Sequence, residues 1–363
     1  MSTQSEQSTL VDEHSQRLVR RLQVTGRGSY IVSLPKEWIE EIGLKKGAEL
    51  EFRRQQDQLV MMALGRDKPY LEASRCVITI SNDTHADSLP RKIISLYLVG
   101  FSTIDITSKA GNLTAAIRHS IRDVVRRKLV GTEVVTESPR SATLQVLLSS
   151  PQLWVPDALR RMSTIAGFMH HDAVQALINS DKELAKQVLN IDDEVDRFSL
   201  YIVRQLKWAV QHPSLVDKIG LKTPIECLGY RMITRSVERS ADHAARVAEN
   251  SLTLQAPPSP ALIRDINSLS ELSHKMMEAS LQALFKEDFQ LAESVILKKE
   301  QISVLEDKLV ERLLKQRIPA SDLSGLRLIL ESLRRIGEYA TDVAEIVLNL
   351  TVRKAVEEQV AVG

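Results

Sequence analysis

Apolar residues recur at three- and four-residue steps through the second half of the chain, from Pro156 onward. This spacing predicts amphipathic helices, because it places the apolar residues along one helix face. Prolines and glycines interrupt the pattern. They divide it into helices at about residues 157–179, 181–211, 223–254, 260–286, 288–316 and 321–353. The break at Pro257–Pro260 separates these into two groups of three. Two consecutive three-helix bundles are therefore predicted.

The last helix of each group has nearly the same pattern. Residues 236–252 read SVERSADHAARVAENSL, and residues 332–348 read SLRRIGEYATDVAEIVL, at an offset of 332 − 236 = 96. The middle helices also correspond, through a Leu-Ala-x2-Val motif that begins at Leu184 and again at Leu291. Self-similarity of this kind indicates an internal repeat. Small residues in the apolar seam of both last helices predict close approach of a neighbouring helix.

Acidic side chains accompany this seam in both copies. Glu238 and Asp242 are four residues apart, as are Glu338 and Asp342, so each pair shares one helix face. Like charges at this spacing mildly destabilise a helix. A cation, a basic partner or water must offset them, and the pattern leaves these three alternatives open.

Shorter segments fill the beginning of the chain. Residues 1–16 are polar and predict a disordered tail. Residues 17–66 then predict a small β domain. It has strands at Arg20–Thr25 and Ser29–Ser33, a short helix at Lys36–Ile42 ended by Gly43, and a hairpin of Ala48–Arg54 with Leu59–Ala63. Because so short a piece has too little core to be stable alone, we expect it to associate with another chain.

A linker around Pro69 leads to a predicted α/β segment at residues 73–150. Its element order is β-α-β-α-β-β, which indicates a small sheet with helices on one face. The expected strands are Val77–Ser81, Thr103–Thr107, Glu133–Glu137 and Thr143–Leu148, and the helices are Arg91–Val99 and Leu113–Leu129.

The second of these helices has a basic stripe. Arg118, Arg122 and Arg126 are spaced i, i+4, i+8, and Arg127 and Lys128 extend the stripe. Two interpretations stay open. The stripe is either a solvated helix face or a site for an acidic partner or an anionic ligand.

Composition supports a mainly α-helical protein. Of 363 residues, 43% are hydrophobic but only 4% are aromatic, which is typical of helix bundles and not of sandwiches or barrels. The 48 basic and 47 acidic residues nearly cancel, so any nucleic-acid contact must come from a local patch. The two cysteines have no metal-ligand spacing, and no apolar stretch is long enough to span a bilayer. A cytoplasmic protein without membrane insertion is predicted.

The sequence does not predict an enzyme, because no Ser-His-Asp or Cys-His arrangement can be assembled from it. Glu271 and His274 have the i, i+3 spacing used in di-iron bundles. Thr164 and Gly167 stand at the equivalent positions of the first repeat, so that motif is not duplicated.

The run from Arg20 to Phe52, with TGRGSYIVSLPKEW followed by EIGLKKGAELEF, resembles the SpoVT-AbrB swapped-hairpin domain of bacterial and archaeal transcription factors and antitoxins. The resemblance implies that two chains interleave their hairpins into a homodimer that binds DNA. It further implies DNA contacts from Arg20, Arg21, Arg27 and Lys36.

The short helix departs from the pattern of DNA-binding members of that family. Where those members have basic residues, this chain has Ile39, Glu40 and Glu41. Acidic groups repel phosphate, so weaker binding or a different docking is expected.

The two tandem bundles, residues 153–256 and 259–355, resemble PhoU, the phosphate-uptake regulator. The motif that supports this is the acidic pair on the third helix of each repeat, together with carboxylates on the second helix. The resemblance implies that these clusters bind a divalent metal ion or iron, since hard cations prefer oxygen ligands. The implied ligands are Asp192, Asp196, Glu238 and Asp242 in the first repeat and Glu338 and Asp342 in the second.

The second repeat departs from this pattern. Arg334 stands where the first acid should be, and Lys299 and Ser303 replace Asp192 and Asp196. An arginine beside the stripe can neutralise Glu338 without a metal ion.

Together these resemblances predict a dimeric transcription regulator of phosphate uptake that binds DNA through its first domain. The alternative is an adaptor that does not bind DNA and that regulates a phosphate ABC transporter, or its signalling partners, through the bundles.

Overall fold

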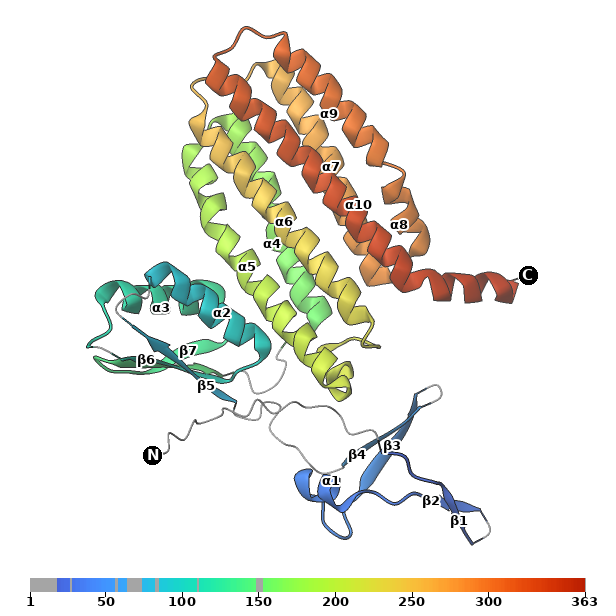
Figure 1. Cartoon of the computed structure of the whole chain (residues 1–363). Helices are drawn as coiled ribbons and strands as arrows, with labels where there is room; N and C mark the ends of the chain where they lie inside the picture. The colour runs from blue at the N-terminus through green and yellow to red at the C-terminus, as the bar shows by residue number, and fades with distance from the viewer. Residues whose placement is uncertain are drawn as a thin grey trace, which may run out of the picture. The chain divides into compact units, whose positions relative to one another are not determined.

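The structure is a computed structural model that describes residues 18–26, 28–55, 58–63, 74–81, 85–109, 111–147 and 153–362. The chain divides into two compact units, Met1–Lys68 and Pro69–Gly363 (Figure 1). The predicted tail at residues 1–16 and the linker around Pro69 lie outside the described residues.

The first unit, called the head below, consists of two antiparallel strand pairs and one short helix. Strand β1 (Gln23–Thr25) pairs with β2 (Ser29–Ile31), α1 is Lys36–Glu41, and β3 (Leu50–Gln55) pairs with β4 (Gln58–Ala63). Gly43, just past α1, has a φ of 63°, the left-handed conformation expected of a helix-ending glycine. The predicted elements are confirmed, with shorter first strands.

The α/β segment has the predicted order of elements. It consists of β5 (Arg75–Ile80), α2 (Leu89–Val99), β6 (Thr103–Ser108), α3 (Ala115–Lys128), β7 (Thr132–Glu137) and β8 (Ser141–Val146). The strands lie in the order β5-β6-β8-β7, with β5 parallel to β6 and the other pairs antiparallel. Helices α2 and α3 cover one face of this sheet (Figure 1). Their apolar residues bury a core with the inward side chains of the strands.

The helical half contains α4 (Val155–Asn179), α5 (Lys182–Gln211), α6 (Glu226–Thr253), α7 (Pro260–Lys286), α8 (Phe289–Ile296), α9 (Lys299–Leu314) and α10 (Ala320–Val362). Two predictions need correction. The helix expected at residues 288–316 is broken at Leu297 and Lys298, and the last helix continues past residue 353. Neither proline nor glycine causes the break, and Leu297 is 78% exposed. Across the described residues, we find no helix long and apolar enough to cross a bilayer.

A repeated turn confirms the duplication at the level of backbone conformation. Ser180 ends α4 and Glu287 ends α7, and both have a φ of 53° although neither is glycine. The next residue in each case, Asp181 or Asp288, caps the following helix by accepting backbone N–H groups. The two repeats therefore share the same connection between their first and second helices.

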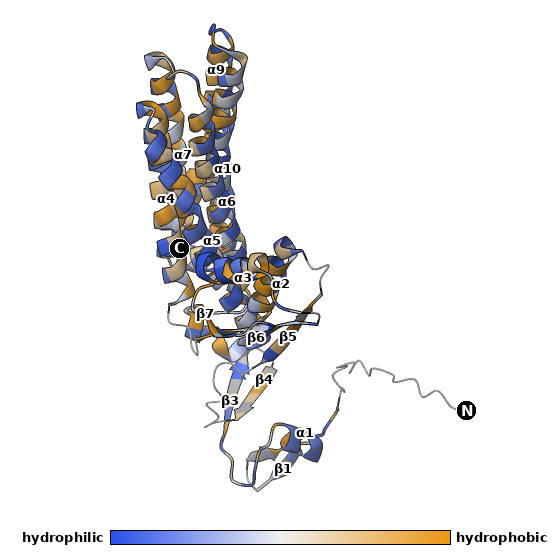
Figure 2. Cartoon of the chain, turned by 90° about the vertical axis from the view of Figure 1, so that its left-hand side faces the viewer, coloured by the Kyte–Doolittle hydropathy of each residue, from blue (hydrophilic) through white to orange (hydrophobic). Residues whose placement is uncertain are grey.

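Helices α6 and α10, the doubled helices of the sequence, lie side by side in the middle of the bundle (Figure 1). Ala241, Ala244, Ala340 and Ala344, which belong to the small-residue seam of these two helices, are buried. A Cβ atom added at Gly337 would overlap the side chain of Ile302 on α9, so this glycine permits close packing of α9 on α10. Figure 2 shows that the bundle helices carry both polar and apolar residues along their length. One apolar core thus extends through both repeats.

Candidate functional site

The carboxylates of the first repeat come together between α5 and α6, as predicted. Burial, followed by the negative charges of Asp196 and Asp242, raises the pKa of Asp192 to about 6. The pKa of Asp242 is likewise raised by burial and then by Glu238 and Asp196. The two helices therefore form one acidic patch, which consists of Asp192, Asp193, Asp196, Glu238 and Asp242 and is called the first acidic cluster below.

The end of α3 lies on this cluster. Lys128, the last residue of α3, donates from Nζ to Asp196 Oδ2 at 2.5 Å, and the same Nζ lies 2.6 Å from Asp193 Oδ1. Arg127 Nε donates to Asp193 Oδ2 at 2.5 Å. Although burial opposes the shift, these hydrogen bonds lower the pKa of Asp193. The basic stripe thus meets an acidic partner, and that partner lies within the same chain.

The other arginines of the basic stripe do not contact the first acidic cluster in the described part of the chain. Arg118 and Arg122 hold the two carboxylate oxygens of Glu137 on β7, at 2.7 and 2.8 Å. Arg126 is exposed and has no recorded ion pair in the described part of the chain. The stripe therefore fixes α3 to its own sheet at one end and to α5 at the other.

The first acidic cluster does not fit a metal ion in this arrangement. The Lys128 ammonium is within hydrogen-bonding distance of Asp193 and Asp196, and Arg235 Nη1 lies 2.5 Å from Glu238 Oε1. A hard cation needs several oxygen ligands at about 2.0–2.6 Å. With Lys128 and Arg235 in place, no three His, Cys, Asp or Glu side chains among the residues that the structure describes are arranged to hold one. The geometry gives the metal prediction no support, and it stays a prediction.

The second repeat supplies its own positive charge. Arg334 donates to Glu338 Oε1, and Arg335 Nη1 donates to Glu338 Oε2 at 3.0 Å. The expectation that Arg334 pairs with Glu338 is confirmed. Burial and then Glu345 raise the pKa of Asp342, whereas Lys299 opposes this shift. The two predicted ligands of this repeat therefore lie beside basic residues.

Glu306 on α9 extends this network and was missed in the sequence. Its side chain is only 5% exposed, with Arg327 Nη1 at 2.6 Å and Arg334 Nε at 3.7 Å. A signal was present, because Arg327 and Arg334 are seven residues apart and so share one face of α10. The acid that they face could not be identified without the packing of α9 on α10.

A second contact joins the α/β segment to the bundle. Arg204, in the last third of α5, is 3% exposed. Its guanidinium donates to the backbone oxygens of Tyr97, Gly100 and Phe101, the last two at 3.1 and 3.3 Å. These oxygens lie at the C-terminal end of α2, where the helix dipole favours a cation. Burial lowers the pKa of Arg204. The α/β segment is therefore anchored on α5.

Three of the predicted DNA contacts, Arg20, Arg21 and Lys36, are exposed in the head. Arg20 and Arg21 lie in the segment just before β1, and Arg27 lies outside the described residues. Lys36, at the start of α1, is 3.4 Å from Glu40. Pairing with Glu40 reduces the positive charge that Lys36 offers to phosphate.

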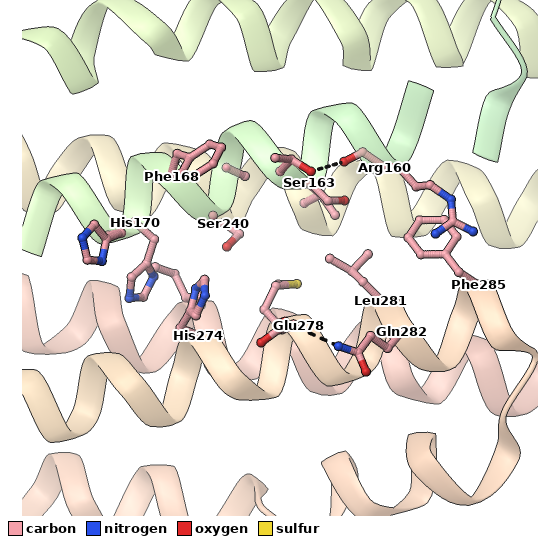
Figure 3. Close-up of a pocket in the computed structure, with 17 residues that line it drawn as sticks. Arg160, Ser163, Phe168, His170, Ser240, His274, Glu278, Leu281, Gln282 and Phe285 are labelled. Atoms are coloured by element: carbon pink, nitrogen blue, oxygen red, sulfur yellow. Dashed lines mark hydrogen bonds between the residues drawn. The ribbon is translucent and has the colours of Figure 1, made fainter. Parts of the chain in front are cut away.

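A cavity of about 650 Å³ opens between α4 and α7, on a floor formed by α6 and α10 (Figure 3). At one end, the guanidinium carbon of Arg160 lies 3.8 Å from the centre of the Phe285 ring. At the other end, the rings of His170 and His274 are 5.5 Å apart. This volume suits a small organic molecule. The lining mixes a cation, a carboxylate and imidazoles, so it favours no single class of ligand.

His170 is a buried and neutral group in this cavity wall. Its Nε2 lies 2.7 Å from Ser270 Oγ, and its Nδ1 has no recorded partner within the described ranges. Burial, reinforced by His274, lowers the pKa of His170 to about 3. Glu271 pairs with Lys275 at 3.1 Å, whereas the ring of His274 lies beside that of His170.

The family comparisons agree with both halves of this architecture. The PhoU domain family matches residues 159–251 and 266–347, one match for each repeat. The family described as antidote-toxin recognition MazE, bacterial antitoxin, matches residues 23–69 in the head. No match of either family covers the α/β segment.

Individual relatives match the helical half. A phosphate-specific transport system accessory protein PhoU homolog from Pseudomonas aeruginosa is 31% identical over 193 residues, which are 50% of this chain and 75% of that protein. A homolog of the same description from Caulobacter vibrioides is 28% identical over 194 residues, or 52% of this chain and 82% of that protein.

A solved structure agrees with the sequence comparisons. The crystal structure of PhoU from Pseudomonas aeruginosa superimposes with a TM-score of 0.50 and 25% identity, covering 55% of this chain and 96% of that one. Both resemblances noted in the sequence are confirmed. The chain belongs to the PhoU family and has an antitoxin-type domain at its N-terminal end.

Proposed function

We propose that this chain regulates phosphate uptake as a DNA-binding homodimer, in which the heads contact DNA and the PhoU bundles receive the phosphate-dependent signal. The observation that carries the proposal is the presence of both modules in one chain, the antitoxin-type head at residues 23–69 and the two PhoU repeats. The relatives are accessory proteins of phosphate-specific transport systems. By binding promoter DNA, the head would link the state of such a transport system to transcription.

The exposure of the head supports the dimer. All residues of β1 and β2 are exposed, and α1 buries none of its residues. Large apolar side chains such as Tyr30, Phe52 and Leu59 are 65–77% exposed. A soluble domain rarely leaves so much apolar area uncovered. A second copy that interleaves its hairpins would cover these side chains.

The charge on the head supports DNA as its ligand. Arg20 and Arg21 are adjacent in sequence and exposed, just before the start of β1. Each basic group that neutralises a phosphate releases counterions, so binding should weaken steeply with salt. Glu40 beside Lys36 works against this contact, and it is the observation that favours the alternative adaptor function.

The test is a fluorescence-anisotropy titration of the full chain with promoter DNA of phosphate-transport genes at several salt concentrations. A variant with Arg20→Ala, Arg21→Ala and Arg27→Ala should bind more weakly. Its logarithmic salt slope should fall by about 0.9 for each phosphate that the variant no longer neutralises. Light scattering should show that the variant is still a dimer.

The matched control changes three exposed basic residues of the helical half, Lys182→Ala, Arg231→Ala and Lys308→Ala, which removes the same total charge. This control should bind DNA like the wild type. If wild-type binding is absent, or is insensitive to salt and to the head substitutions, the DNA-binding function is refuted. The adaptor function then stands, in which the head serves only to form the dimer.

A further inference from the structure

In both acidic stripes of the bundle, some of the carboxylates form ion pairs with basic residues of the chain itself. In the second repeat the charges come from the same helix, through Arg334 and Arg335 beside Glu338. In the first repeat, Arg235 of the same helix pairs with Glu238. The α5 side of the first acidic cluster receives Arg127 and Lys128 from the α/β segment.

We propose that the ammonium group of Lys128 takes the place of the metal ion that a PhoU-type carboxylate cluster implies in the first repeat. The α/β segment thereby serves as the fixed counter-ion of this cluster. The inference rests on the PhoU fold and on the α3–α5 contact, and it does not depend on DNA binding by the head.

The contact geometry supports this replacement. An ammonium group is a compact charge with three donors and no acceptor, and it can bridge several carboxylates. Lys128 Nζ lies 2.5 Å from Asp196 and 2.6 Å from Asp193. A divalent ion coordinated by Asp196 would lie next to this ammonium, and the two positive charges would repel each other. Metal binding there requires Lys128 to leave.

The position of Lys128 does not depend on its charge alone. Leu129, the next residue, is buried in the α/β core, and Val130 packs against the bundle core. From the other side, Leu200 of α5 packs against the α/β core, and Arg204 holds the end of α2. Apolar contacts and backbone hydrogen bonds therefore place the end of α3 on α5, so Lys128 reaches the cluster from a preformed position.

The pairing is also selective within the basic stripe. Arg126, two residues before Lys128, is exposed and forms no ion pair with a carboxylate in the described part of the chain. It provides a matched control, because Arg126→Met and Lys128→Met remove the same charge from the same helix turn.

The experiment measures Mn²⁺ bound by the full chain, from the loss of the free-ion signal in electron paramagnetic resonance. The proteins are the wild type, Asp242→Asn, Lys128→Met, Arg126→Met and the double variant Lys128→Met with Asp242→Asn. The wild type and Asp242→Asn should bind the same amount of Mn²⁺. Lys128→Met should bind one additional ion per chain, which the double variant should lose. Arg126→Met should bind as the wild type does.

Two results would overturn the proposal. The first is wild-type protein that binds one Mn²⁺ ion more than Asp242→Asn does, since the metal would then occupy the cluster beside Lys128. The second is a folded Lys128→Met protein that gains no Asp242-dependent site. Circular dichroism verifies the folding of each variant, and the comparison of wild type with Asp242→Asn stays decisive even if Lys128→Met fails to fold.

Discussion

Replacing His170 with leucine should flatten the pH dependence of stability between about pH 7 and pH 5. In the folded protein His170 is buried against Ser270 and His274, and its pKa is lowered from 6.5 to about 3. In the unfolded chain the same imidazole takes up a proton near its ordinary pKa. The unfolded state therefore binds more protons over this range, and the residue's contribution to stability falls as the pH falls.

The magnitude follows from the difference between the two pKa values. At pH 5 the unfolded imidazole is about 1.5 pH units below its pKa, whereas the folded imidazole is still neutral. At about 1.4 kcal/mol per unit, wild-type protein should lose roughly 2 kcal/mol from His170 between pH 7 and pH 5. His243, whose pKa is lowered to about 4, and Asp192, whose pKa is raised to about 6, contribute equally to wild type and variant. Their effects cancel in the comparison.

The assay is urea unfolding followed by circular dichroism at both pH values, for wild type, His170→Leu and His171→Leu. His171 is exposed and adjacent in sequence, and its charge is the smallest of the causes that lower the pKa of His170, so its substitution should change the pH dependence far less than His170→Leu does. If His170→Leu loses as much stability as the wild type between the two pH values, His170 is not held neutral. The assigned burial and pKa would then be wrong.

Three further substitutions test the charges and the exposed apolar surface. Glu306→Gln leaves two arginines facing a neutral group, so urea titrations should show a free energy of unfolding that is lower by roughly 2 kcal/mol. The control is Glu311→Gln on the exposed side of α9, which should change this free energy little. Arg204→Met removes the donors to the end of α2, so hydrogen exchange of α2 amides measured by mass spectrometry should become at least about tenfold faster. Lys207→Met, on an exposed position of α5, should leave that exchange unchanged, and equal effects of both variants would contradict the anchoring role. Leu59→Lys in the head should weaken the dimer in light scattering, and an undiminished dimer would place the contact elsewhere.

Much of the architecture could be predicted because its signals are local. The Pro257–Pro260 break, the duplicated third helix and the strand–turn patterns of the head depend on neighbouring residues only. The break between α8 and α9 could not be predicted, since Leu297 and Lys298 include neither proline nor glycine. Hydrophobic periodicity therefore does not locate this break.

Side chains of the candidate site that share one helix could be predicted from the sequence, whereas contacts between different segments could not. The i, i+4 carboxylates and the basic stripe follow from helix geometry alone. Their pairing joins Lys128 to Asp196, which are 68 residues apart, and it depends on docking α3 against α5. Arg204 did leave a signal that was not used, because a charged residue inside the buried run Tyr201–Leu206 needs a buried partner.

Helix α5 has a mechanical consequence for the protein. Its 30 residues form a rod of about 45 Å that contributes side chains to the core of the bundle and also, through Leu200, to the core of the α/β segment. Because α5 belongs to both cores, no flexible connection separates the bundle from the α/β segment at this helix. If an event in the first repeat tilts or rotates α5, the α/β segment that packs on this helix should move with it, and a displacement of that segment should in turn act on the bundle core.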